Sequence, residues 1–128
     1  MAFWSKKSIR ESIIEYLEEQ KVSYKEEFGC ITFELYFKRD EFSIFPYIKI
    51  NEMNEELSFV VNLKEVDNYK DCSKLNKFNA LSKFVAAKAK DNLLFLEYNC
   101  FTNPTVAPQL IDKIVESLYG LQSEIDKL

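Results

Sequence analysis

The sequence predicts an α+β domain in which helices pack on an antiparallel sheet, with elements in the order α-β-β-β-β-α-β-β-α. Apolar residues recur every three or four positions near both ends of the chain and once in its second half, which is the helical period. Between these segments the period falls to two, which is typical of strands with one buried face. The connections between strands have hairpin lengths and therefore favour antiparallel pairing.

The first helix is expected over residues 5–20, where charged side chains alternate with an apolar stripe of Ile9, Ile13, Tyr16 and Leu17. Its start carries two signals. Ser8 with Glu11 fits a capping box, whereas Ser5 as the cap would place Trp4 against the first apolar residue as a hydrophobic staple. Both interpretations make Trp4 an anchor of the helix.

Four strands are predicted next, over residues 22–26, 31–37, 44–51 and 57–64. Gly29 is placed to close the first turn, and residues 51–56 form the hairpin between the third and fourth strands. Pro46 cannot donate to a strand ladder. The third strand is therefore expected to lie at an edge of the sheet or to carry a bulge near its start.

The second half of the chain is predicted to hold a helix, two strands and a long final helix, over residues 71–83, 84–89, 93–101 and 105–128. Apolar positions of the middle helix are Cys72, Leu75, Phe78 and Leu81, and those of the last helix are Leu110, Ile111, Ile114, Val115, Leu118, Leu121 and Ile125.

Short signals mark the ends of these segments. Residues 90–92 suit a tight turn, Thr105 is expected to cap the last helix, and Pro108 fits its first turn. Gly120 interrupts that helix at a cost of about 1 kcal/mol relative to alanine. It either permits close approach of another element or subunit or is simply tolerated. No linker or repeat occurs, so residues 1–128 are expected to form a single domain.

Composition excludes several classes of function. With 2 glycines among 128 residues, the chain has no glycine-rich phosphate loop. With no histidine, it lacks the usual general base and the commonest metal ligand. Its net charge of -4 has the wrong sign for nucleic acid or anionic membrane. Adjacent carboxylate pairs occur only where solvated surface is expected, so we predict no enzyme, no catalytic residues, no cofactor and no metal site. A carboxylate site assembled from distant residues is the remaining enzymatic alternative.

The cysteines indicate a reducing compartment. Cys30, Cys72 and Cys100 are odd in number, widely spaced and free of any CxxC pair, so we expect small buried thiols rather than disulfides. The chain starts without the apolar region of a signal peptide and has no stretch long enough to span a bilayer. A cytoplasmic protein is expected.

Aromatic residues occupy strand positions that should be polar. If Ile44, Ile48 and Ile50 point inward, Phe45 and Tyr47 point outward. The predicted protein-binding patch consists of Tyr36, Phe42, Phe45, Tyr47 and Val60. Alternatively, a bulge at Pro46 reverses the alternation and sends Phe45 or Tyr47 into the core. A third possibility is that edge-strand backbone in this region accepts an extended peptide by strand addition.

Three segments carry a family resemblance: Leu75-Asn76-Lys77-Phe78-Asn79, Leu94-Phe95-Leu96-Glu97-Tyr98 and Thr105-Val106-Ala107-Pro108-Gln109-Leu110. With the order of elements, they resemble the YbjN-like family of proposed bacterial sensory transduction regulators, whose fold is shared with type III secretion chaperones. The chain departs from that family in its lysine-rich surface and in Asn103-Pro104, which replaces a glycine before the last helix. We expect Asn76 and Asn79 to satisfy nearby backbone groups rather than to bind a ligand.

The resemblance implies a non-enzymatic, often dimeric domain that acts on other proteins as a chaperone-like or regulatory adaptor. The main hypothesis is therefore a cytoplasmic homodimer that presents an apolar strand surface to a protein partner. One alternative is an acidic immunity or antitoxin-type inhibitor that masks a basic nuclease cleft. Another is a small-molecule sensory domain with a pocket between sheet and helices.

Overall fold

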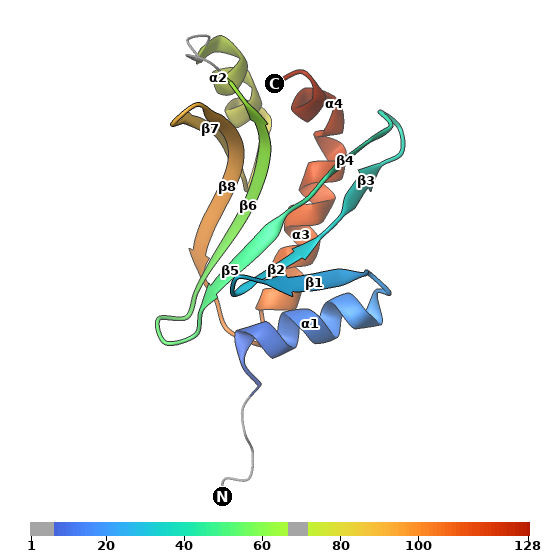
Figure 1. Ribbon diagram of the computed structural model, residues 1–128, viewed down its shortest axis with the longest axis vertical. Coiled ribbons are helices and arrows are strands. Elements are labelled where there is room, and N and C mark those ends of the chain that lie inside the picture. The colour runs from blue at the N-terminus through green and yellow to red at the C-terminus, as the bar shows by residue number, and fades with distance from the viewer. Residues whose placement is uncertain (1–6, 67–71) are drawn as a thin grey trace, which may run out of the picture.

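The computed structural model describes residues 7–66 and 72–128, and it has the predicted α+β architecture (Figure 1). The elements are α1 (Ile9–Glu19), β1 (Tyr24–Glu27), β2 (Cys30–Phe33), β3 (Leu35–Phe37), β4 (Phe42–Ile44), β5 (Tyr47–Asn51), β6 (Glu56–Glu65), α2 (Cys72–Leu81), β7 (Ala86–Lys90), β8 (Leu93–Phe101), α3 (Ala107–Gly120) and α4 (Gln122–Asp126). Six strands form an antiparallel sheet in the order β1-β2-β5-β6-β8-β7, while β3 and β4 form a separate ribbon.

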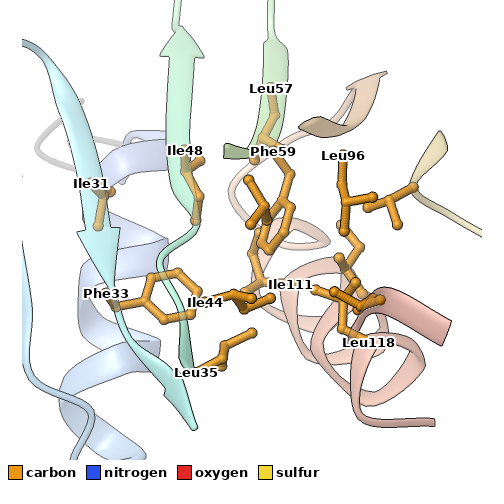
Figure 2. Packing of buried hydrophobic residues seen from close by; sticks show 14 of the residues in the cluster. Ile31, Phe33, Leu35, Ile44, Ile48, Leu57, Phe59, Leu96, Ile111 and Leu118 are labelled. Carbon is orange, nitrogen blue, oxygen red and sulfur yellow. The ribbon is translucent and has the colours of Figure 1, made fainter. Parts of the chain in front are cut away.

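The hydrophobic core lies between one face of this sheet and helices α1 and α3. Inward side chains of the central strands, such as Ile48 and Phe59, form one buried cluster with Ile13 of α1 and Ile111 of α3. Figure 2 shows Ile48, Phe59 and Ile111 in this cluster. Phe33 and Phe59 pack edge to face with ring centroids 6.5 Å apart. The predicted apolar faces of the first helix and of the strands are therefore confirmed.

The second and third predicted strands are each divided in two. β2 and β3 pair with β5 and β4 in one continuous register, from Cys30 opposite Lys49 to Phe37 opposite Phe42. The ladder is interrupted at Pro46, which has no N–H, although its carbonyl still accepts from the Phe33 N–H at 3.3 Å. The edge position expected for this strand is wrong, because β5 lies between β2 and β6.

The interruption at Pro46 leaves the alternation of side chains unchanged. Ile44 before the proline and Ile48 after it are both buried, at 5% and 0% exposure. No residue is inserted into the ladder, so the inward face stays the same along the whole ribbon. The alternative in which Phe45 or Tyr47 turns into the core is therefore wrong.

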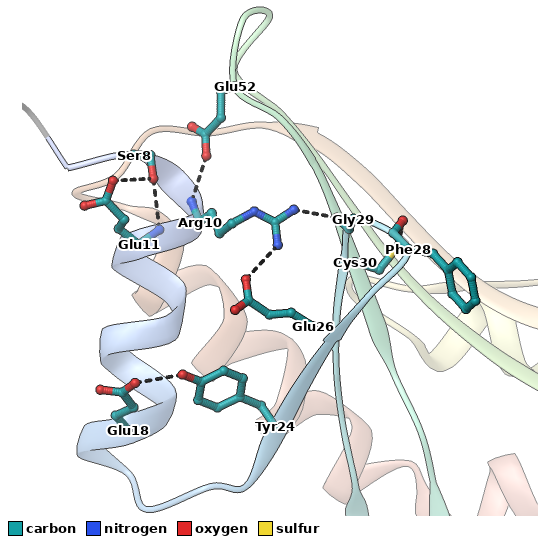
Figure 3. A network of polar contacts seen from close by, with 10 residues as sticks. All are labelled: Ser8, Arg10, Glu11, Glu18, Tyr24, Glu26, Phe28, Gly29, Cys30 and Glu52. Carbon is teal, nitrogen blue, oxygen red and sulfur yellow. Dashed lines mark hydrogen bonds and ion pairs between the residues drawn. The ribbon is translucent and has the colours of Figure 1, made fainter.

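Helix α1 is held at its N-terminus by polar contacts with two turns of the sheet (Figure 3). Ser8 Oγ accepts from the Glu11 N–H at 3.0 Å, which confirms Ser8 as the cap. The Glu52 carboxylate, from the β5–β6 turn, accepts from the N–H groups of Ile9 and Arg10, each at 2.9 Å. Arg10 in turn donates to the Gly29 carbonyl in the β1–β2 turn. Ser5 and Trp4 lie outside the described residues.

The two tight turns agree with the predicted hairpins. Phe28 and Gly29 have φ of 52° and 75°, and Asp91 and Asn92 have φ of 53° and 63°. Two successive residues in the left-handed region are characteristic of the two-residue turns that match the twist of hairpin strands. Gly29 supplies the conformation at one of these positions without steric cost.

The last predicted helix is divided and begins later than expected. α3 starts at Ala107, and its cap residue Val106 makes no side-chain cap bond. Thr105 is therefore not the cap. Instead Asn103 Oδ1 accepts from the N–H groups of Thr105 and Val106, each at 2.9 Å. Leu121 leaves the helical conformation, with φ of −106° and ψ of 10°, and separates α3 from α4.

Helix α2 packs on the edge strand β7. The Asn79 side chain accepts from the Ala87 N–H at 2.7 Å and donates to the Ala87 carbonyl at 3.1 Å, which confirms its expected role. Asn76 is exposed. Phe78 is buried as predicted, but Leu81 is 53% exposed and does not belong to the core. The Cys72 side chain lies outside the described residues.

Candidate functional site

The face of the sheet opposite α1 and α3 carries no helix in the part of the chain that the structure describes (Figure 1). We call it the open face. At its centre Tyr47 on β5 lies opposite Val60 on β6, which lies opposite Glu97 on β8. These residues line a shallow hollow of about 190 Å³. The position matters because a solvent-facing sheet surface is normally polar, whereas this hollow is lined by Tyr47, Val60, Leu93 and Phe95 together with Lys49, Ser58, Asn62 and Glu97.

Four of the five predicted patch residues lie on the outward side of their strands. Tyr36 is 51% exposed and Phe45 is 63% exposed, while Tyr47 is half-buried. Val60 has the predicted outward direction but is only 6% exposed, because its strand neighbours on the open face surround it. It therefore forms the floor of the patch rather than part of its surface.

Phe42 does not belong to this patch. It lies opposite Phe37 at the far end of the ribbon, and their rings meet edge to face with centroids 5.0 Å apart. Phe37 is fully buried, so Phe42 packs against the core from the inward side of the ribbon. Its grouping with the outward aromatics is wrong, since alternation from Ile44 places residue 42 on the same side as the core isoleucines.

Two open-face residues were missed by the sequence reasoning. Leu93 and Phe95 on β8 line the same central hollow as Val60. Phe95 lies opposite Asn62 on β6, one outward position along from Val60. The signal was present in the sequence, because Phe95 alternates with the buried Leu94 and Leu96. What the sequence did not show is that β8 pairs with β6.

Charged groups at the edges of the central hollow are partly neutralised. Lys88 Nζ lies 2.7 Å from Glu97 Oε1, and this hydrogen bond holds the pKa of Glu97 below its usual value against the opposing effect of burial. The Lys49 ammonium lies 5.9 Å from the centre of the Tyr47 ring, within the range of a cation–π contact. Apolar and aromatic side chains thus lie beside charged and polar ones at this hollow.

A second hollow adjoins the ribbon. Its volume is about 410 Å³, and its lining includes Tyr24, Thr32 and Phe45. Thr32 lies opposite Tyr47, so this hollow and the central one are neighbours on the same face. The aromatic side chains of the open face therefore extend from the middle of the sheet to the ribbon.

Strand addition at β5 itself does not fit the observed sheet. β5 is paired on both sides, and the edges of the six-stranded sheet are β1 and β7. The backbone of β7 is already bonded by Asn79 at Ala87. In contrast, β3 and β4 pair only with each other among the described residues, so strand addition at this ribbon stays a prediction.

The remaining chemistry of the described residues is sparse. No group of three or more Cys, Asp or Glu side chains within residues 7–66 and 72–128 is placed to hold a metal ion. Cys30 and Cys100 are free thiols and are half-buried rather than buried as expected. Burial raises the pKa of the Cys100 thiol.

None of the described helices combines the length and apolar character needed to span a bilayer.

Comparison with known proteins identifies the fold. No family model and no curated protein sequence matches this chain. YbjN of E. coli, a proposed transcription regulator, has a similar structure with a TM-score of 0.60 over 86% of this chain and 85% of its own, at 15% identity. A chain of the HopA1–SchA chaperone–effector complex matches with a TM-score of 0.61 over 93% of both chains, at 7% identity. The predicted YbjN-like and secretion-chaperone-like fold is therefore confirmed. Neither neighbour is described as an enzyme.

Proposed function

We propose that this chain is a non-enzymatic protein-binding module, a chaperone-like or regulatory adaptor of the cytoplasm. The observation that carries the proposal is the group of apolar and aromatic side chains on the open face, where Tyr47, Val60 and Phe95 line a hollow that no helix among the described residues covers. Apolar patches with charged edges are typical of surfaces that bind other proteins. The fold shared with a chain of a chaperone–effector complex supports the same class of function.

The geometry favours an extended or partly folded partner segment. The aromatic side chains follow the strand direction from the central hollow to Phe45, which is 63% exposed at the start of the ribbon. A segment lying along them could place alternate side chains into the two hollows, which is how extended peptides obtain specificity on a sheet. In the proposed homodimer, each copy contributes one such face.

The first experiment is affinity co-purification of the tagged chain from its source cells at moderate salt, with mass spectrometry of the bound proteins. The partner recovered is then titrated against the double variant Phe45→Ala/Tyr47→Ala. We expect binding to weaken about tenfold or more, as for aromatic hot-spot residues. The matched control is Phe28→Ala, because Phe28 is 101% exposed but lies in the β1–β2 turn away from the patch.

Stability measurements show whether these variants report on binding. The exposed Phe45 side chain should contribute no more than about 0.5 kcal/mol to folding. Loss of the Tyr47–Val60 cross-strand pair should cost about 1 kcal/mol or less. Unchanged affinity of the double variant, or a large loss of stability, would contradict the patch.

The same partner assay separates the other two classes of function. Binding to the apolar patch should change little with ionic strength, whereas an acidic inhibitor of a basic nuclease should lose affinity steeply as salt is added. A co-purified small molecule without any protein partner would instead support a sensory domain. Sedimentation velocity of the chain alone tests the proposed homodimer.

A further inference from the structure

A second apolar surface runs between α2 and the α3–α4 pair, and none of its residues belongs to the open face. One hollow of about 320 Å³ lies between α2 and α4, and another of about 470 Å³ lies between the end of α2 and α3. Lys77 faces Glu124 across the first, and Leu81 and Gly120 line the second. Leu81 lies about one helical turn after Phe78 on α2, and Glu124 lies about one turn after Leu121. The two hollows therefore follow one another between α2 and the α3–α4 pair. We call them the α2–α3 groove.

The floor of the groove is apolar. Phe78 and Leu128 form it at one end, and Phe84 and Leu121 form it at the other. Leu81, which the helical pattern assigned to the core, is 53% exposed here. Phe78 and Leu128 are 1% and 6% exposed, so the apolar surface open to solvent here is that of Leu81 beside the half-buried Phe84 and Leu121.

Gly120 is a second unusual feature of the groove. A glycine near the end of a helix costs about 1 kcal/mol relative to alanine. A Cβ atom added at Gly120 would meet no other atom within 4 Å, so nothing inside the molecule requires the glycine. The open space leaves room for a separate chain to approach the helix backbone closely at this position.

The edges of the groove carry charge opposite to that of the whole protein. Five lysines line it against two glutamates, although the chain as a whole has a net charge of -4. Glu124 lies 3.9 Å from Lys77 and 3.7 Å from Lys127, and Glu116 lies 3.9 Å from Lys113. The other lysines, Lys74 and Lys83, have no ion pair among the described residues.

We propose that the α2–α3 groove binds an amphipathic helix of a partner protein, with an apolar face flanked by acidic residues. A helix fits because the groove lies between helices, has an apolar floor, and follows the 10 residues of α2, which span about 15 Å or almost three turns. The lysine excess selects acidic flanks, and Gly120 permits the close approach of the bound backbone. This site is independent of the open face.

The test uses two synthetic helical peptides with the same leucine face. One peptide carries glutamate at all remaining positions, and the other carries lysine there. Each is labelled and titrated with the full chain by fluorescence anisotropy. We expect the acidic peptide to bind and the basic peptide not to bind. The double variant Lys77→Glu/Lys83→Glu should weaken the acidic peptide at least about tenfold. The control Lys25→Glu/Lys49→Glu, on the open face, should leave its affinity unchanged.

Gly120 provides a steric test that does not depend on charge. Gly120→Trp should fill the groove and abolish peptide binding, whereas Gly120→Ala should keep both peptide binding and the melting temperature of the parent. The melting temperature of Gly120→Trp is measured beside it to show that the variant is folded. Equal binding of the acidic and basic peptides, or binding that survives both Gly120→Trp and the lysine reversals, would overturn the proposal. So would a dimer that Gly120→Trp dissociates, because a second copy would then occupy the groove. Phe45→Ala should have no effect, which separates this result from the proposed function.

Discussion

At the scale of single residues, Phe37 shows how much one side chain contributes to the join between ribbon and helix. It is fully buried, and its ring meets Phe42 and Tyr119 edge to face at 5.0 and 5.3 Å. We expect Phe37→Ala to lower the free energy of unfolding by about 3–5 kcal/mol, because it leaves a cavity and removes both ring contacts. Urea denaturation measures the change. The exposed Phe28→Ala should change it by about 0.5 kcal/mol or less, and equal losses would contradict the assigned burial.

Tyr16 gives the molecule a stability that depends on alkaline pH. Burial, aided by the hydrogen bond that its hydroxyl donates to Asp112 of α3, raises the pKa of Tyr16 to about 12. The folded chain therefore holds this proton more tightly than the unfolded chain, whose tyrosine titrates near pH 10. The resulting stabilisation is fully present below about pH 10 and is lost as the pH rises toward 12.

This prediction is checked by comparing the parent chain with Tyr16→Phe in denaturant titrations between about pH 8.5 and about pH 11, a range that starts below the unfolded pKa of about 10 and ends where the stabilisation is being lost. The difference in unfolding free energy between the two should shrink as the pH rises through this range. Other tyrosines and the lysines titrate in both proteins, so they cancel in the comparison. A constant difference would show that Tyr16 does not titrate differently in the two states.

At the scale of elements, the docking of α2 on β7 depends on one amide. Asn79 satisfies both the N–H and the carbonyl of Ala87 on an edge strand. We expect Asn79→Ala to cost about 1–3 kcal/mol, because both backbone groups lose their partner. Hydrogen exchange should show faster exchange of the Ala87 amide. The exposed Asn76→Ala on the same helix is the control and should leave that rate unchanged.

The elements also show where a one-dimensional pattern is sufficient. The period of two placed Ile44 and Ile48 inward and Phe45 and Tyr47 outward, and the structure confirms these directions on both sides of Pro46. The pattern did not show that the ladder is interrupted there, because Phe45 and Pro46 keep the alternation. The division of the last helix at Leu121 was missed for a similar reason, since the apolar stripe continues through Ile125, which is buried in α4.

At the scale of the whole molecule, helices from both ends of the chain share one core with the sheet. Ile9 and Ile13 from α1 and Ile111 and Leu118 from α3 belong to the same buried cluster. We therefore expect the predicted single domain to unfold in one cooperative transition. Far-ultraviolet circular dichroism and tyrosine fluorescence should give the same urea midpoint. Two separate midpoints would contradict a single domain.

The candidate sites also belong to this scale. Tyr47 and Val60 were identified from alternation alone, but only the sheet register places them opposite one another and brings Phe95 beside them. Phe42 was assigned to the patch because it is aromatic and near in sequence, although its position in the ribbon turns it toward Phe37. The α2–α3 groove joins two distant segments, residues 74–84 and 113–128, so no local motif could have indicated it.

The sequence by itself determined the fold class, the order of most elements and the inward side of each strand, because hydrophobic burial imposes a period of two on strands and 3.6 on helices. Tertiary structure decided which strands are neighbours, where Pro46 and Leu121 divide their elements, and which surface residues meet. Those outcomes depend on backbone pairing and packing between distant segments, which leave no period in the chain. The group of apolar and aromatic side chains around Val60 and the lysine-edged groove at Gly120 are both products of that packing.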